Sequence, residues 1–154
     1  MAERLRLDDL LAGGQLKRHS PSPAETGDLL AVAERQLADA AATGLSPDGR
    51  FAAAYGAAIT LATLVVRASA CRVADASAHQ RLTIALLPVF LGDGQRRGAT
   101  YLDACRRKRN VAQYDRADTT SPAESKALLA AARELQEAVT AWLAEVHPEL
   151  LSSL

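Results

Sequence analysis

The chain has 154 residues, of which 49% are hydrophobic but only 4% are aromatic. This length suits a single domain with a substantial core, and that core must consist chiefly of Ala, Leu and Val. Because Ala and Leu are strong helix formers and aromatic residues are scarce, the composition favours an all-α fold over a sheet. Lys and Arg total 18, as do Asp and Glu, so the formal net charge is zero.

The sequence of residues 1–20 predicts a loose N-terminal arm. One turn of helix fits residues 4–11, and Gly13-Gly14 interrupts it. The N-terminus has mixed charges and no apolar stretch followed by a cleavage pattern, so no secretory signal is visible and we expect a cytoplasmic protein. Residues 21–154 are then expected to form a single helical bundle domain.

Three later segments start helices with one pattern, in which Ser caps the helix and Pro occupies its first position. They are Ser22-Pro23-Ala24-Glu25, Ser46-Pro47-Asp48-Gly49 and Ser121-Pro122-Ala123-Glu124. In the first and the third, Glu at the third helical position predicts a capping box. We expect the corresponding helices over residues 23–42, 47–73 and 122–146.

Two more helices fit between the second and the last of these. Residues 76–91 form the shorter one, in which Pro88 predicts a kink or an early end. A turn at Gly92-Asp93-Gly94 precedes the other, which is expected from about Arg97 to Gln113 or Tyr114. Because short connections favour antiparallel neighbours, we predict an up-and-down antiparallel bundle of four main helices plus a shorter fifth.

The helix after Ser46 is apolar nearly all round and is expected at the centre of the bundle. Its longest apolar run, Phe51 to Val66, lies between Arg50 and Arg67 and is shorter than the roughly 20 residues that span a bilayer. We therefore expect a buried helix and no membrane association.

Neither the cysteines nor the histidines predict a metal site. Cys71 and Cys105 are far apart and match no metal-ligand spacing, so in a reducing compartment they are most simply small buried residues. His19, His79 and His147 are equally scattered. We expect no metal and no other cofactor.

Four consecutive cations, Arg106 to Arg109, mark the most informative segment. Residues 95–116 hold seven basic and two acidic side chains, a local charge of +5, so the remainder of the chain carries −5. A cationic patch on an otherwise acidic protein suits a polyanion or an acidic partner. The alternative is a solvated helix face, on which Arg107 pairs with Asp103 one turn earlier.

A helical wheel divides residues 101–115 into two faces. The apolar face is predicted to hold Tyr101, Leu102, Ala104, Cys105, Val111 and Ala112. The polar face is predicted to hold Asp103, Arg106, Arg107, Asn110 and Tyr114, with Arg109 at the margin. Asn is unfavourable inside a helix because its side chain competes for backbone hydrogen bonds, so Asn110 indicates a local hydrogen-bonding role.

Arg109-Asn110-x-x-x-Tyr114-Asp115 resembles a variant of the HEPN signature, in which Arg and a following polar residue precede a His by four to six intervening positions. Similarity to a group of small actinobacterial-type HEPN proteins also covers residues 44–55, His79 with its following apolar helix, and residues 105–115. The resemblance implies a helical bundle that dimerises, with two motif helices lining a shared cleft. In active members, as the resemblance implies, Arg handles the phosphate and His the proton, and RNA is cut without a metal.

The chain departs from this signature at the His. Arg109 and Asn110 match, whereas Tyr114 occupies the position of the His, and neither of its neighbours, Gln113 and Asp115, is a His. A phenol has a pKa of about 10 and a carboxyl group one of about 4, whereas general acid–base catalysis at neutral pH requires a pKa of about 7. His79 is an alternative source of the imidazole, and its other interpretation is a structural histidine between helices.

We therefore expect a binding protein rather than an enzyme. The leading hypothesis is a homodimer that binds RNA or a partner protein through a basic cleft. The residues assigned to that cleft are Arg106, Arg107, Arg109, Asn110, Tyr114 and Asp115. The resemblance also implies a toxin–antitoxin or nucleotidyltransferase-associated system, with Tyr114 as the residue that a nucleotidyltransferase-type partner would modify.

Two alternatives stay open at this point. One is a metal-independent endoribonuclease in which Arg109 acts with Tyr114 or His79. The other is a structural role, in which the cations contact an acidic helix such as the one that carries Glu124. RNA cleavage in the presence of EDTA would distinguish the first, and a loss of stability on removal of the cations would distinguish the second.

Overall fold

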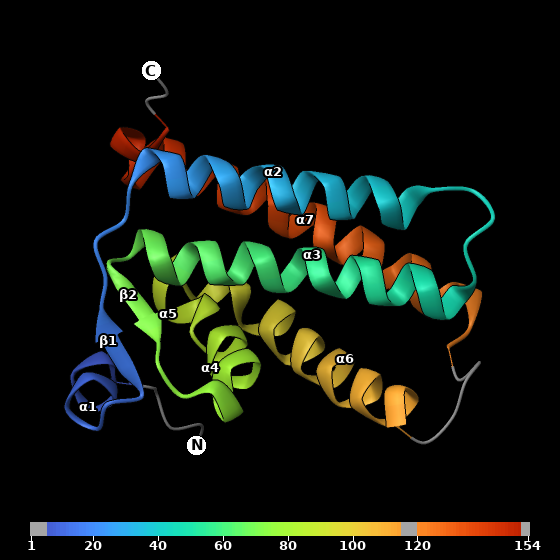
Figure 1. Cartoon of the computed structure of the whole chain (residues 1–154), viewed down its shortest axis with the longest axis horizontal. Coiled ribbons are helices and arrows are strands. Elements are labelled where there is room, and N and C mark those ends of the chain that lie inside the picture. Colours follow the sequence, from blue (N-terminus) through green and yellow to red (C-terminus); the bar gives the residue numbers. More distant parts are fainter. Residues whose placement is uncertain (1–5, 115–119, 152–154) are drawn as a thin grey trace.

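The computed structural model describes residues 6–114 and 120–151, and of residues 111–114 it describes the helical backbone alone. Four long helices dominate: α2 (Pro23–Ala41), α3 (Pro47–Ala68), α6 (Arg96–Tyr114) and α7 (Pro122–Val146). The predicted all-α fold is confirmed. Figure 1 shows α2 and α3 running in opposite directions, with α7 packed against both and α6 on the other side of α3 from α2.

Serine caps start three of these helices, as the sequence predicts. The hydroxyls of Ser22, Ser46 and Ser121 each accept a hydrogen bond from the backbone N–H three residues later, at 3.1, 3.0 and 3.1 Å. Each such cap stabilises its helix by about 1 kcal/mol. The capping box predicted at Ser121 is complete, because the Glu124 side chain accepts from the Ser121 backbone.

The capping box predicted at Ser22 does not form, because the Glu25 carboxylate has other partners. It lies 2.8 Å from Nε2 of His19 and 3.0 Å from Nη1 of Arg67. Burial raises the pKa of Glu25, but the hydrogen bonds from His19 and Arg67 outweigh it and hold that pKa below its usual value. The cluster joins the start of α2 to the end of α3.

The central helix is α3, whose large buried side chains include Phe51, Tyr55, Leu61 and Leu64. Each such side chain contributes about 1.5–3 kcal/mol through burial, and the alanines between them let the neighbouring helices approach closely. The apolar run from Phe51 to Val66 is too short to cross a membrane, but α3 as a whole is long and apolar enough to do so by length and composition. Most of that stretch is buried inside the bundle.

The helix predicted over residues 47–73 is too long. α3 ends at Ala68, and Ala70 has a φ of 64°, a left-handed conformation that interrupts a helix. The chain then forms β2 (Cys71–Val73), which pairs antiparallel with β1 (Leu16–Arg18). In this register Leu16 lies opposite Val73, and Arg18 lies opposite Cys71.

The described part of the predicted arm, residues 6–20, forms regular structure, and its helix overlaps the turn of helix predicted at residues 4–11. α1 (Leu7–Ala12) precedes and contacts β1, and Figure 1 shows both at the same end of the molecule as β2. A second apolar cluster holds this region against the bundle. Its buried members are Leu10, Leu16, Val66, Cys71, Leu82 and Leu86.

Residues 76–91 form three short elements rather than one helix. These are η1 (Ala76–Ala78), α4 (His79–Ala85) and α5 (Leu87–Leu91). Pro88 has no backbone N–H to donate to Ile84, so the helix breaks at Leu86, and the predicted early end is confirmed. Two further 3₁₀ turns, η2 (Asp93–Gln95) and η3 (Pro148–Leu150), precede α6 and follow α7.

Candidate functional site

The buried stripe of α6 is narrower than the helical wheel predicts. Ala99, Leu102 and Cys105 recur every three residues and are buried, whereas Tyr101 is 36% exposed and Ala104 is exposed. The reason is that α6 packs against α3, α4 and α5 along one side. The side chains at 111 and 112, which the wheel placed on the same face, lie outside the described residues.

Arg109 continues this stripe, one turn beyond Cys105, and therefore faces the bundle. Its guanidinium lies over the ring of Tyr55 on α3, with 5.4 Å between Cζ and the ring centroid. Such a contact contributes about 0.5–2 kcal/mol, depending on how far it is removed from water. The position of Arg109 at the margin of the two faces thus gives its apolar stem and its charged head different environments.

Tyr55 is 1% exposed, and its hydroxyl donates a hydrogen bond of 2.8 Å to Oε1 of Gln80 on α4. Burial raises the pKa of Tyr55 to about 12, although the charges of Arg106 and Arg109 oppose the shift. The ring therefore contacts α6 while its hydroxyl binds α4. Tyr55 thus packs in the core and also joins α4 to α6.

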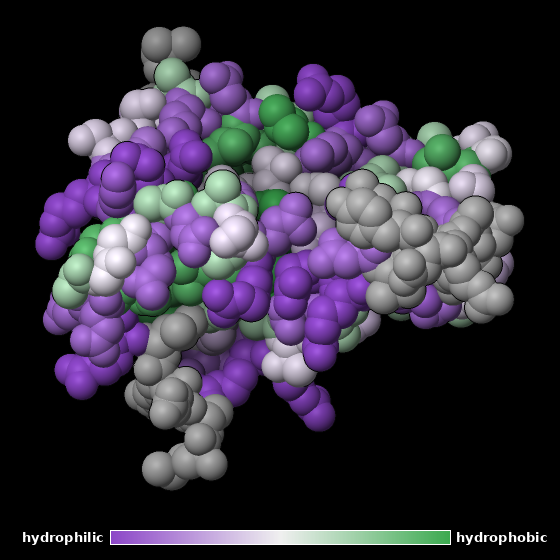
Figure 2. Space-filling model, turned by 60° about the horizontal axis from the view of Figure 1, so that its bottom comes forward, coloured by the Kyte–Doolittle hydropathy of each residue, from purple (hydrophilic) through white to green (hydrophobic). Residues whose placement is uncertain are grey.

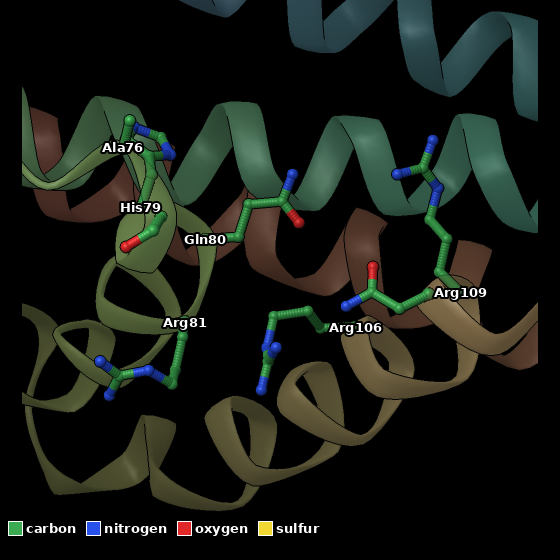
Figure 3. A pocket seen from close by; sticks show the side chains of 8 residues that line it. Ala76, His79, Gln80, Arg81, Arg106 and Arg109 are labelled. Carbon is green, nitrogen blue, oxygen red and sulfur yellow. The ribbon is translucent and has the colours of Figure 1, made fainter. Parts of the chain in front are cut away.

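Between α4 and α6 lies a pocket of about 520 Å³. Its wall consists of Ala76, Ser77, His79, Gln80, Arg81, Arg106, Arg109 and Asn110. Figure 3 shows Gln80 extending from the α4 side towards the α6 side, where Arg106 and Arg109 lie. Figure 2 views the molecule from the side that carries these two helices, where hydrophilic side chains cover much of the surface.

The charge of this wall is positive. Three guanidinium groups line it, together with an imidazole and two carboxamides, and no carboxylate is among its described lining residues. Arg106 is held by Asp103, with 2.9 Å between Nε and Oδ1. Within residues 6–114 and 120–151, Arg81 and Arg109 have no ion pair at 4 Å or less, although the charge of Arg81 acts on the nearby Asp75.

The other two cations of the motif lie outside the pocket. The side chain of Arg107 is 67% exposed, with its Nε 3.6 Å from Oδ2 of Asp103. This is the pair with Asp103 that the sequence suggested for a solvated face. Nζ of Lys108 lies 3.0 Å from Oε2 of Glu124 and so connects α6 to α7, as the structural alternative expected for this part of the motif.

Two residues of the predicted cleft fall outside what the structure describes. Asp115 belongs to the omitted residues, and of Tyr114 only the helical backbone is described. Asn110 is exposed at the rim of the pocket. His79, which the sequence offered as an alternative imidazole, stands at the first position of α4 and lines the same pocket as Arg109.

Sequence reasoning missed Gln80, Arg81 and Ser77 as pocket residues. All three lie within two residues of His79 in the chain, so they could have been named together with it. That they lie close to residues 106–110 in space could not be read from the sequence. Asp75 caps η1 by accepting from the backbone N–H and the hydroxyl of Ser77, at 3.0 and 2.7 Å. This cap fixes the turn from which His79 and Gln80 extend.

The described residues contain no group of three or more metal-binding side chains. Cys71 and Cys105 are buried and free, and burial raises the pKa of both thiols, so they are poor nucleophiles. The chemistry that the pocket offers is therefore hydrogen bonding, positive charge and the imidazole of His79. No protein-family model, curated protein or solved structure matches the chain.

Proposed function

We propose that this protein binds RNA through the pocket between α4 and α6. The observation that carries the proposal is the wall itself, where Arg81, Arg106 and Arg109 line one pocket without a carboxylate among its described lining residues. A guanidinium is always charged and presents paired N–H donors that match phosphate oxygens. Such a group of donors suits a phosphate backbone better than a neutral ligand.

The charge distribution supports the same proposal. The cationic segment of residues 95–116 belongs to a chain whose remainder carries −5, so an incoming polyanion is repelled elsewhere and attracted to α6. Phosphate contacts supply most of the affinity of nucleic-acid binding and require no particular base sequence. Asn110 and Ser77 at the same pocket add groups that can bind a sugar or a base edge.

The HEPN resemblance contributes two further parts of the proposal. It implies a homodimer in which the motif helices of two copies share a cleft, and a toxin–antitoxin or nucleotidyltransferase-associated setting. Light scattering of the purified protein tests the first part, since a dimer has twice the 16.3 kDa mass of the chain. A monomer at all concentrations would remove the dimer and leave the RNA-binding pocket of the single chain.

Salt titration of RNA binding tests the central proposal. The logarithm of the affinity for a labelled single-stranded RNA should fall linearly with the logarithm of salt concentration, and each of Arg81→Ala and Arg109→Ala should reduce the slope by about one. Arg133→Ala, which removes an exposed arginine from α7, is the matched control and should leave the slope unchanged. Absent or salt-independent binding would reject the proposal.

A second candidate function is metal-independent RNA cleavage, which the position of His79 favours. An imidazole in the same pocket as Arg109 supplies the proton-transfer group that the motif itself lacks. In this mechanism His79 removes the proton of the 2′-hydroxyl as that oxygen attacks the adjacent phosphorus. The bond from phosphorus to the 5′-oxygen breaks, the imidazolium returns the proton to the departing 5′-oxygen, and a 2′,3′-cyclic phosphate is left. Arg109 neutralises the charge that develops on the phosphate. The pocket residues then act on a bound strand without any cofactor.

Labelled RNA incubated with the protein in EDTA tests this second function. Wild-type protein should cut the RNA, while His79→Ala should bind it with little change in affinity but without cutting it. Arg109→Ala should bind the RNA more weakly, as in the salt titration, and should not cut it. Equal cleavage by the wild type and by both variants would indicate a contaminating nuclease and would reject the enzyme.

A further inference from the structure

The side-chain amide of Gln80, which lines the pocket, is oriented by a hydrogen bond from a buried residue. Gln80 Oε1 accepts the hydrogen bond of the Tyr55 hydroxyl, whose oxygen lies 2.8 Å away. A carboxamide has an acceptor at one end and two donors at the other. With the oxygen occupied, the N–H groups of Gln80 are the part left for the pocket.

Tyr55 keeps this orientation over the ordinary pH range. Burial raises the pKa of its hydroxyl to about 12, so the hydroxyl retains its proton and continues to donate. Arg109 lies over the face of the same ring, which limits its rotation. Within the described parts of the chain, Nε2 of Gln80 has no hydrogen-bond partner of its own.

Donors therefore dominate the pocket wall. Arg81, Arg106 and Arg109 have only donors, and the fixed Gln80 adds another pair. A ligand that fits this arrangement needs several acceptors, negative charge and no competing donor. A phosphate group fits these conditions best, because it is negatively charged and most of its oxygens are acceptors.

We infer that Tyr55 is a positioning residue that fixes Gln80 as a donor, and that Gln80 thereby makes the pocket selective for a phosphate group. The inference rests on the proposed function in that it takes the pocket to be the ligand site. It goes further by naming the chemical group that the pocket recognises and a buried residue that determines the recognition. The group can come from an RNA end, an internal phosphodiester or free phosphate.

Inorganic phosphate is the simplest probe. Its titration into the wild-type protein should shift the side-chain amide resonances of Gln80 in nitrogen–proton NMR spectra. Gln80→Glu replaces the donor with a carboxylate and should weaken phosphate binding about tenfold or more, since it also repels the anion. Arg133→Gln lowers the net charge by the same amount on α7 and should change binding less than about twofold.

Tyr55→Phe tests the positioning role. It keeps the ring but removes the hydroxyl, so the amide of Gln80 can turn over and phosphate affinity should fall roughly threefold. In a Gln80→Leu background the same change should have no effect on phosphate affinity, because Tyr55 acts through Gln80. An equal effect in both backgrounds, after equal folding is verified by urea titration, would overturn the inference.

RNA probes separate the possible sources of the phosphate. A preference for a 5′-phosphorylated over a 5′-hydroxyl single-stranded RNA would assign an end, and equal binding would assign internal phosphodiesters. In either case Gln80→Glu must weaken binding, and unchanged binding overturns the inference while the proposed RNA binding stands. Phosphate binding at Gln80 without RNA binding would reject only the proposed function, and binding of neither would reject both.

Discussion

The guanidinium of Arg109 lies over the ring of Tyr55, and the hydroxyl of that ring binds Gln80. One buried side chain on α3 therefore contacts both walls of the pocket, α6 through its face and α4 through its oxygen. Because α3 is the central helix, these contacts give the pocket a rigid support. The two walls come from separate segments of the chain, 76–81 and 106–110.

The contact between Arg109 and Tyr55 should be measurable as a coupling energy. Arg109→Ala should lower the free energy of unfolding by about 0.5–1 kcal/mol in the wild type and equally in Tyr55→Phe, which keeps the aromatic face. In Tyr55→Leu the additional cost of Arg109→Ala should fall close to zero. Urea titrations of the single and double variants measure this, and full additivity with Tyr55→Leu would contradict the contact.

Removing Asp103 should strengthen anion binding. Its carboxylate pairs with both Arg106 and Arg107, so Asp103→Ala leaves both guanidinium groups unpaired and raises the local charge by one. We expect RNA affinity to rise by roughly two- to tenfold at low salt. Asp39→Ala, on the exposed face of α2, is the control with the same charge change. Weaker RNA binding with lower stability would favour the structural interpretation of the cations.

The hydroxyl of Thr83 weakens the core. Thr83 is 1% exposed, and its Oγ1 has no hydrogen-bond partner among the described residues. Thr83→Val should therefore raise the free energy of unfolding by about 1 kcal/mol. Thr26→Val is the matched control, because the hydroxyl of Thr26 donates to the Ser22 carbonyl at 2.9 Å and its loss should be destabilising. Thermal or urea unfolding measures whether each variant is more or less stable than the wild type.

The left-handed conformation of Ala70 is better suited to glycine. With a φ of 64°, its Cβ approaches the following carbonyl, which costs about 1 kcal/mol. Ala70→Gly should raise the free energy of unfolding by roughly 0.5–1 kcal/mol. Ala31→Gly, at an exposed position within α2, should lower it by a similar amount. A loss of stability on Ala70→Gly would contradict this conformation.

Acid should weaken the cluster of His19, Glu25 and Arg67. The pKa of Glu25 is lowered in the folded protein, so the folded state binds this proton less readily than the unfolded chain. The stability that Glu25 contributes is present above its unfolded pKa of about 4.3 and is lost as the pH falls through the lower folded value.

Glu25→Gln should therefore be less stable than the wild type near pH 7, and the difference should shrink as the pH falls below about 4.3. Urea titrations at a series of pH values measure it, with Glu134→Gln on the exposed face of α7 as control. A difference that stays constant with pH would show that the charge of Glu25 has no part in the cluster.

Much of the fold could be predicted from local chemistry. The Ser-Pro starts gave the beginnings of three helices, because a hydroxyl cap and a proline without an N–H both act within one turn. The strands at 16–18 and 71–73 could not be found, since each is too short for an alternating pattern to be recognised. Their pairing also joins two segments that are distant in the chain, with all of α2 and α3 between them.

The candidate site was only partly accessible to sequence reasoning. The charges of Arg106 and Arg109 and the imidazole of His79 were identified, but their shared pocket depends on the packing of α4 against α6. The wheel also overestimated the buried face, since Tyr101 is partly exposed. Periodicity gives the direction of a side chain but does not tell how much of a helix its neighbours cover.

The short β1–β2 ladder has a consequence for the wall that carries His79 and Gln80. α4 has seven residues, too few for a helix to persist alone in water, and it depends on its attachments at either end. One attachment is β2, whose pairing partner comes from the beginning of the chain. A shortened protein lacking β1 should retain its long helices but lose the anchor of α4. The wall of the pocket that carries His79 and Gln80 would then not be formed before a ligand binds.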